Sequence, residues 1–228
     1  MKPVGAGGFG RQRQERLKAQ KKLEAEWREA YANIIREAMA LENVLHNDVK
    51  ECTRLAFGPK KTDSGSRAFV RAVFAFIEGG LYSLKRIALY VGTQQNLFTT
   101  SELALLEEKS YDIDEKGVVR QSPKYIQLLN NVKFSFAAHA RVYHLSFKIN
   151  TQDPGWFALV EALKVRHRIT HPKKTEELTV SAQELKWAKE AAEFYARSRM
   201  QLSKTMLKRK KRLEKLFLDM HQPFKRRE

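Results

Sequence analysis

The sequence predicts an all-α fold, a helical bundle with long amino- and carboxyl-terminal helices. Its 228 residues are 43% hydrophobic and 30% charged, with only 11 Gly and 6 Pro. Such a balance is typical of a folded, helix-rich protein. Apolar residues recur at spacings of three and four along most of the chain, which is the period of an amphipathic helix. Residues that commonly cap helices precede several of these segments.

A Gly-rich, basic stretch opens the chain, and we expect residues 1–12 to form a flexible arm. A long amphipathic helix is predicted from Arg13 to just before the Gly-Pro pair at 58–59, because Gly and Pro end helices. Its apolar positions are Leu23, Trp27, Ala30, Ile34, Ala38, Leu41, Leu45, Val49 and Cys52.

The most apolar segment, residues 67–91, is predicted to be the central helix of the bundle. A polar loop over 60–66 precedes it, and its apolar residues cover more than one helix face, as burial on several sides requires. Gly79 and Gly80 lie within it, and each costs about 1 kcal/mol of helix stability relative to Ala. We interpret them as a place where a neighbouring backbone approaches closely.

Three shorter elements are predicted next. Thr99, with Glu102 three residues later, forms a capping box for a short helix. Residues 110–121 are expected to form a loop or a small hairpin. The Ser-Pro pair at 122–123 has the cap-then-proline order of a helix start. We therefore expect the following helix to run from there to about His144.

The last two helices are also marked by caps. An Asp-Pro pair at 153–154 predicts one helix, which should end at or just before His171 because the next residue is a proline. Ser181 and Glu184 form a capping box for the final helix. This helix should be about 58 Å long at 1.5 Å per residue.

The final helix carries an apolar seam with coiled-coil-like spacing. The seam can cover the core, pair with the first helix or pair with a second copy of the chain, and the last option predicts a homodimer. Its members are Leu185, Ala188, Ala192, Tyr195, Arg199, Leu202, Met206, Arg209, Leu213, Leu216 and Met220.

The formal net charge of +17 is concentrated at both ends of the chain and in one internal segment. Residues 1–22 hold seven cations and one acid, 164–174 five cations, 204–215 seven cations and one acid, and 225–228 three cations and one acid. A near-neutral body with basic ends is typical of a protein that binds a polyanion such as RNA. The alternative is that the basic ends only aid solubility or adhere to nucleic acid non-specifically.

The chain is predicted to divide into a basic arm (1–12), the bundle (13–203) and a basic helical extension with a tail (204–228). Cys52 is the single cysteine, which excludes an intrachain disulfide and suits a reducing compartment. The apolar run at 68–84 is interrupted by charges and glycines and does not suit a membrane span. The amino terminus lacks signal-peptide features, so we expect a soluble, cytoplasmic protein with no membrane contact.

The segment 164–174 holds the residues most suggestive of chemistry. Arg166 can hold a phosphate and His171 can transfer a proton, which is the minimal equipment for cutting RNA. In an ideal helix, residues five apart lie about 140° apart around the axis. A helix that ends at His171 leaves the imidazole free to turn back toward Arg166. The carboxyl end of the helix favours a protonatable imidazole.

This segment resembles the active-site motif of the HEPN superfamily, the higher eukaryotes and prokaryotes nucleotide-binding domains. The motif is an arginine, a polar residue, a short spacer and a histidine near the end of a bundle helix. Here it reads Arg166, His167, three further residues and His171. Residues 67–85 also look like the central helix of uncharacterised bacterial members. The resemblance covers roughly residues 23–200 and leaves both basic ends as additions.

The resemblance implies a metal-independent endoribonuclease of the toxin or antiviral-defence type. Members often dimerise so that two motifs face one cleft, so a homodimer is expected. An antitoxin or a defence-system protein is a further expected partner. His171 would act as general base or acid, Arg166 would stabilise the phosphorane, and His167 would position the phosphate or the other two side chains. The product would end in a 2′,3′-cyclic phosphate.

Other residues are predicted to support the site, each with a structural alternative. Glu78, an acid in the most apolar helix, would orient Arg166 by a hydrogen bond or form a purely structural salt bridge. Arg166 and His171 could themselves be a helix-end ion pair and a helix cap. The cations expected to contact RNA, or else to form solvated surface, are Lys164, Arg168, Lys173, Lys174, Lys208, Arg209, Lys210, Lys211 and Arg212.

Two further interpretations stay open. A non-catalytic nucleic-acid-binding or coiled-coil scaffold protein on the same fold would use the final basic helix rather than His171. A metal site at His167 and His171 would require the helix to continue past Thr170, which the following proline disfavours. We therefore expect neither a metal nor a cofactor.

Overall fold

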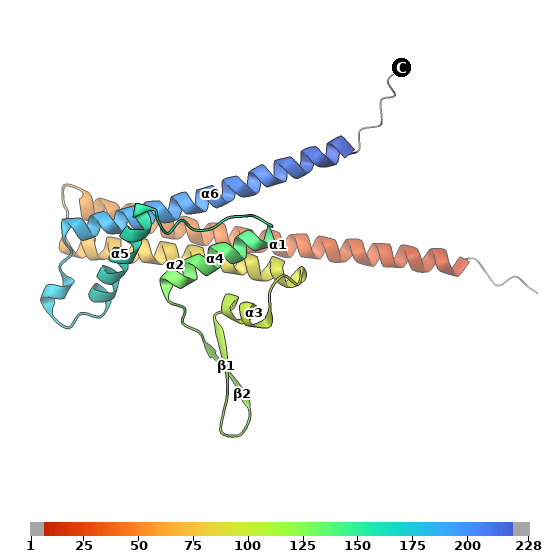
Figure 1. The fold of residues 1–228 in the computed structure, drawn as a ribbon, viewed down its shortest axis with the longest axis horizontal. Helices are drawn as coiled ribbons and strands as arrows, with labels where there is room; N and C mark the ends of the chain where they lie inside the picture. Colours follow the sequence, from red (N-terminus) through yellow and green to blue (C-terminus); the bar gives the residue numbers. More distant parts are fainter. Residues whose placement is uncertain (1–6, 221–228) are drawn as a thin grey trace, which may run out of the picture.

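The computed structural model describes the backbone of residues 7–220 and the side chains of residues 13–213. Over that range the chain forms six α-helices, one 3-10 helix and one β-hairpin (Figure 1), so the all-α prediction is confirmed. The helices are α1 (Gly7–Phe57), α2 (Asp63–Gln94), α3 (Thr100–Leu106), α4 (Leu128–Val142), α5 (Pro154–Thr170) and α6 (Ala182–Met220), with η1 (Thr175–Leu178) before α6. Strands β1 (Lys109–Ile113) and β2 (Val119–Pro123) pair antiparallel. Among the described residues, no helix combines the length and the apolar character needed to span a bilayer.

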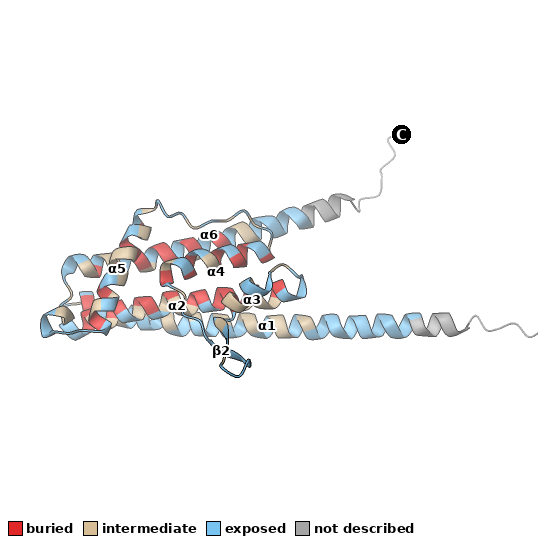
Figure 2. Cartoon of the chain, turned by 60° about the horizontal axis from the view of Figure 1, so that its bottom comes forward, coloured by how far each residue is buried: buried red, intermediate tan, exposed pale blue. Residues whose placement is uncertain are grey.

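Helix α2 is the centre of the bundle (Figure 2). Helices α1, α4, α5 and α6 all pack against it. The apolar side chains that it buries are Phe69, Val70, Val73, Phe74, Ile77, Leu81, Leu84, Ile87, Ala88 and Val91. Full burial of each larger one stabilises the fold by about 1.5–3 kcal/mol. The prediction of a central helix here is confirmed.

Both terminal helices extend past the bundle at the same end (Figure 1). In α1 the side chains of residues 13–26 are exposed, and Trp27 is the first that is partly buried. In α6 the last buried side chain is Leu202. We call residues 13–26 the α1 arm and residues 203–213 the α6 arm. The two arms diverge in both views (Figure 1; Figure 2).

The apolar seam of α6 mainly covers the core, which was one of its three predicted roles. Helix α6 packs on α5 and α2, and its Arg199 forms an ion pair with Glu42 of α1. The buried members of the seam are Leu185, Ala188, Tyr195 and Leu202. Beyond Leu202, Met206 is still partly buried against the core, whereas Leu213 is 53% exposed. Pairing with a second copy stays a prediction.

Three predicted helix caps are confirmed. Thr99 and Glu102 form a complete capping box at the start of α3. The Asp153 carboxylate caps α5. Ser181 and Glu184 exchange backbone-to-side-chain hydrogen bonds of 2.8 and 3.3 Å at the start of α6. These local hydrogen bonds satisfy N–H groups that have no partner within the helix.

Two predicted helix starts fall too late. Helix α1 begins at Gly7, so residues 7–12 are helical rather than part of a flexible arm, and residues 1–6 lie outside the described residues. Helix α2 begins at Asp63 rather than near Arg67. Its start is fixed by the Thr62 side chain, which accepts a backbone N–H of the first turn.

The helix start predicted at the Ser-Pro pair 122–123 is wrong. These residues end strand β2, where the Ser122 hydroxyl lies 2.8 Å from the Ser110 hydroxyl of β1. Helix α4 begins only at Leu128, without a side-chain cap. Proline is also tolerated at the end of an edge strand, because only its N–H is missing. The cross-strand pairing of the hairpin therefore overrides the local helix signal.

Gly79 and Gly80 make room for side chains of neighbouring helices, not for a backbone as predicted. A Cβ at Gly79 would overlap Leu45 of α1, and one at Gly80 would overlap the Tyr195 hydroxyl of α6. Tyr195 is 3% exposed, and its hydroxyl has no hydrogen-bond partner among the described residues. The close packing of α1 and α6 on α2 therefore depends on this glycine pair.

We expect Gly80→Ala to lower the free energy of unfolding by about 1–3 kcal/mol, the usual cost of overpacking. This loss should occur even though alanine is the better helix former by about 1 kcal/mol. Adding Tyr195→Phe should restore part of the stability, because the hydroxyl is the nearest atom to the new methyl group. Urea unfolding of the wild type, both single variants and the double variant measures the coupling. A Gly80→Ala protein as stable as the wild type would contradict this contact.

His139 of α4 is buried beside polar groups. Its side chain is 4% exposed, and Nδ1 lies 3.3 Å from the Leu84 carbonyl oxygen. Burial lowers the pKa of His139 to about 4, and the Arg199 cation acts in the same direction, against the hydrogen bond to Leu84. Arg199 itself is paired with Glu42. His139 is therefore neutral in the folded protein at neutral pH.

Acid should destabilise the fold through His139. The unfolded chain gains a proton near pH 6.5, whereas the folded chain resists it until about pH 4, so stability is lost as the pH falls through this window. From pH 7 to pH 5 the loss from this group should be about 2 kcal/mol. Urea unfolding at both pH values, for the wild type and His139→Gln, isolates the contribution. Equal pH dependence in the two proteins would show that His139 is not responsible.

Candidate functional site

The predicted site lies at the carboxyl end of α5. The helix ends at Thr170, and His171 is its C-cap, with φ −126° and ψ 55°. The His171 N–H still donates to the His167 carbonyl at 3.1 Å. The prediction that the helix ends just before His171 is therefore confirmed.

Arg166 contacts α2. Its Nη2 donates to Glu78 Oε1 at 3.0 Å, and its guanidinium carbon lies 6.0 Å from the centre of the Phe74 ring. The Arg166 and Glu78 side chains are 26% and 43% exposed, so the pair is partly desolvated and still open to solvent. A guanidinium has five N–H donors. The remaining donors are available for a phosphate.

Both histidines of the motif are exposed. Within the described part of the chain, no hydrogen bond joins Arg166 to His171, because Arg166 bonds to α2 whereas His171 lies past the helix end. The expected turn of the imidazole back toward Arg166 is thus not seen in this structure. The structure brings Arg166 together with Glu78 and leaves His167 and His171 at the surface of the same helix end.

A second arginine, which the sequence analysis missed, lies at this helix end. Arg71 of α2 donates from Nη2 to the Ile169 carbonyl at 2.9 Å. That carbonyl belongs to the last turn of α5, where carbonyls lack partners within the helix. Arg71 and Glu78 are seven residues apart, so they share one helix face with Phe74 between them. The available signal was that Arg71 and Glu78 are the two charged residues in the apolar run 68–84.

Arg168 has structural partners. Its Nη1 donates to the Glu177 and Thr179 carbonyls at 2.6 and 2.8 Å. Its Nη2 donates to Glu184 Oε1 at 2.6 Å. These bonds tie the segment before α6 to α5, so Arg168 has a structural role, and its contact with RNA stays a prediction.

The lysines around the motif lie at the surface. Lys164 pairs with Glu161 of its own helix at 2.6 Å. Lys173 and Lys174 are exposed in the loop after α5. These three lysines keep their predicted role as candidate contacts to an RNA backbone.

The predicted RNA-binding cations of α6 lie far from this site. Residues 208–212 are exposed in the α6 arm. Tyr195 packs against Gly80, close to Glu78, and α6 then runs on for about 20 Å before Lys208, at 1.5 Å per residue. The structure thus separates two groups of cations that the sequence analysis combined into one RNA-binding set.

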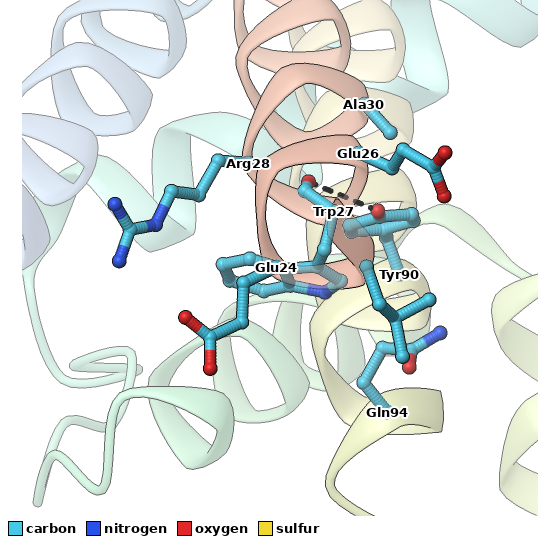
Figure 3. A pocket seen from close by; sticks show the side chains of 8 residues that line it. Glu24, Glu26, Trp27, Arg28, Ala30, Tyr90 and Gln94 are labelled. Carbon is cyan, nitrogen blue, oxygen red and sulfur yellow. Dashed lines mark hydrogen bonds between the residues drawn. The ribbon is translucent and has the colours of Figure 1, made fainter. Parts of the chain in front are cut away.

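Two open grooves lie where the arms leave the bundle. One, of about 580 Å³, lies between α1 and α2 (Figure 3). In it the Tyr90 hydroxyl donates to the Trp27 carbonyl at 3.2 Å, and the two rings stack with their centres 6.0 Å apart. The other, of about 720 Å³, lies between the end of α4 and the α6 arm and is lined in part by Arg209. Neither groove is lined by Arg166 or His171.

The described residues contain no group of three or more His, Cys, Asp or Glu side chains that could hold a metal ion. Comparisons with protein-family models, with curated proteins and with solved structures find no match. The fold and the sites define an all-α bundle with an arginine–glutamate pair at one end and two basic arms at the other. The resemblance to the HEPN superfamily remains a prediction from the motif and residues 67–85.

Arg168→Ala should lower the free energy of unfolding by about 1–3 kcal/mol, because two carbonyls and a carboxylate lose their donor. Lys164→Ala is the matched control on the same helix, and its exposed ion pair should be worth less than about 0.5 kcal/mol. Urea unfolding measures both variants, and amide hydrogen exchange over residues 175–181 should accelerate only in Arg168→Ala. Equal stability of the two variants would refute the structural role of Arg168.

Proposed function

We propose that the chain is a metal-independent endoribonuclease whose site is the carboxyl end of α5. The observation that carries the proposal is the position of Arg166. Its guanidinium donates to Glu78 at 3.0 Å and lies 6.0 Å from the centre of the Phe74 ring. Both histidines of the motif are exposed on the same helix end. A guanidinium fixed in this way is a directed phosphate ligand with little side-chain entropy left to lose.

The proposed reaction is an internal transfer of the phosphate. His171 takes the proton of an RNA 2′-hydroxyl, and the 2′-oxygen forms a bond to the adjacent phosphorus. The bond from phosphorus to the 5′-oxygen then breaks, and that oxygen takes a proton from water at this exposed site. Arg166 stabilises the negative charge of the phosphorane, and His167 positions the phosphate. The products carry a 2′,3′-cyclic phosphate and a 5′-hydroxyl.

Arg71 offsets part of the negative partial charge at the carboxyl end of α5. The carboxyl end of a helix carries partial negative charge, which disfavours a bound phosphate. Arg71 donates to the Ile169 carbonyl in the last turn of α5 and so offsets part of that charge. Lys173 and Lys174, which are exposed just after the helix end, add further positive charge, against the acids Glu176 and Glu177 of η1.

A second candidate function is nucleic-acid binding without catalysis. The Arg166 charge is partly neutralised by Glu78, and the basic arms lie at the opposite end of the bundle. In that case binding would depend on the arms and would be unaffected by changes to His171.

The test is cleavage of a mixed, end-labelled RNA pool in EDTA. The wild type should cut it and leave cyclic phosphates. Both His171→Ala and Arg166→Ala should lower the rate at least about 100-fold, the lower bound for losing a general acid–base group or a charge-stabilising donor. The matched controls are His46→Ala and Arg54→Ala, which change exposed residues of α1 and should leave the rate unchanged.

Circular dichroism confirms that each variant is folded before its rate is compared. Cutting that survives His171→Ala unchanged would contradict the proposed mechanism. Salt-sensitive binding of RNA with no cutting by the wild type would instead support the second candidate.

A further inference from the structure

The two arms present exposed positive charge at one end of the molecule. In the α1 arm, residues 13–26 hold five cations and three acids. Two of the acids, Glu24 and Glu26, lie at the base of the arm, where Glu26 pairs with Lys22 at 3.8 Å. In the α6 arm, residues 204–212 hold six cations and no acid. The backbone is helical throughout both arms, so the cations lie around two helical segments of about 15 Å each, at 1.5 Å and 100° per residue.

Both arms are anchored on neighbouring residues at the end of α4. On one side, the Tyr31 hydroxyl hydrogen-bonds the Tyr143 hydroxyl. Trp27 stacks on Tyr31, with ring centres 5.5 Å apart and planes 5° apart. On the other side, Arg209 Nη1 donates to the His144 carbonyl at 2.6 Å. His144 has φ 50°, so the chain turns here in the left-handed region. The turn at Tyr143 and His144 thus contacts α1 just below its arm and contacts the α6 arm itself.

We propose that the two arms form a fork that binds double-stranded RNA through its phosphate backbones. The choice of RNA rests on the proposed function, whereas the fork itself is derived from the arms alone. Two cationic helices that leave one bundle end repel each other, and a polyanion between them is attracted to both. A second copy of this chain would bring the same charge to the fork and is therefore the less favourable occupant.

The side chains of the arms favour a duplex over a single strand. Proteins that bind single strands without sequence preference stack the bases on aromatic side chains. Residues 13–26 contain no aromatic residue, and residues 203–213 likewise contain only aliphatic, polar and charged residues. Lysine and arginine contact phosphates without reading bases. Two divergent cationic helices match a ligand with two phosphate backbones.

The test uses three variants of the full chain, each of which replaces four cations by glutamine. Glutamine removes the charge and keeps a high helix propensity. The α6-arm variant changes Lys204, Lys208, Lys211 and Arg212, and leaves Arg209 to hold α4. The α1-arm variant changes Arg13, Arg16, Lys18 and Lys21. The matched control changes Lys60, Lys61, Lys116 and Lys124, which are exposed in the loop before α2 and around the hairpin.

Binding is measured by fluorescence anisotropy at several salt concentrations, with a duplex RNA, a duplex DNA and a single-stranded RNA of equal length. All proteins carry His171→Ala and the buffer contains EDTA, so that cleavage does not interfere. Each arm variant should bind the duplex at least about tenfold more weakly and show a shallower dependence of log Kd on log salt. The control should change by less than about threefold, and the duplex should bind more tightly than the single strand.

Several outcomes would contradict the proposal that the two arms bind double-stranded RNA. Equal or tighter binding of the single strand, an effect of only one arm, or equal weakening by the control variant would each do so. Tighter binding of a DNA duplex would overturn the choice of RNA. All binding is measured with His171→Ala proteins, so the binding result does not depend on whether the wild type cleaves RNA. A failure of the fork and a failure of the proposed nuclease are therefore distinguishable.

Discussion

Burial of α2 is the constraint on which the rest of the structure depends. A helix with apolar residues on several faces is stable only when other helices surround it, and α1, α4, α5 and α6 do so. Gly79 and Gly80 allow Leu45 and Tyr195 to pack closely against this helix. Helices α1 and α6 have 51 and 39 residues, whereas α2 has 32. Part of each outer helix therefore has no apolar surface to cover and continues beyond the bundle.

The same packing places the two groups of functional cations at opposite ends. Arg166 pairs with Glu78 at the middle of α2, and the end of α5 contacts Arg71, nearer the start of α2. Trp27, at the base of the α1 arm, stacks on Tyr90 in the last turns of α2. The separation is therefore a property of the helix packing and does not depend on the position of any surface side chain.

The parts of the structure that could be predicted are those set by local chemistry. The caps at Thr99, Asp153 and Ser181 and the end of α5 at His171 follow from short-range hydrogen bonds and proline sterics. The start of α4 could not be predicted, because the pairing of β1 with β2 overrides the local signal.

Contacts between distant segments decide the rest of the candidate site. The Arg166–Glu78 pair could be predicted, because Glu78 is an acid in the most apolar segment and Arg166 follows Leu159 and Leu163 on one face of its helix. The partners of Arg71 and Arg168 are backbone carbonyls, which every residue carries, so side-chain patterns do not reveal them.

The distance between the fork and the α5 site limits how the two could act on one RNA. About 20 Å of α6 separates the level of Glu78 from Lys208, so a short duplex held between the arms does not reach Arg166 of the same chain. A longer RNA reaches it only by running along the bundle, past the surface of α2 and α5. A second chain bound to the same RNA, rather than to the fork itself, would remove this requirement. Cooperation between binding and cleavage therefore requires either a long substrate or a dimer.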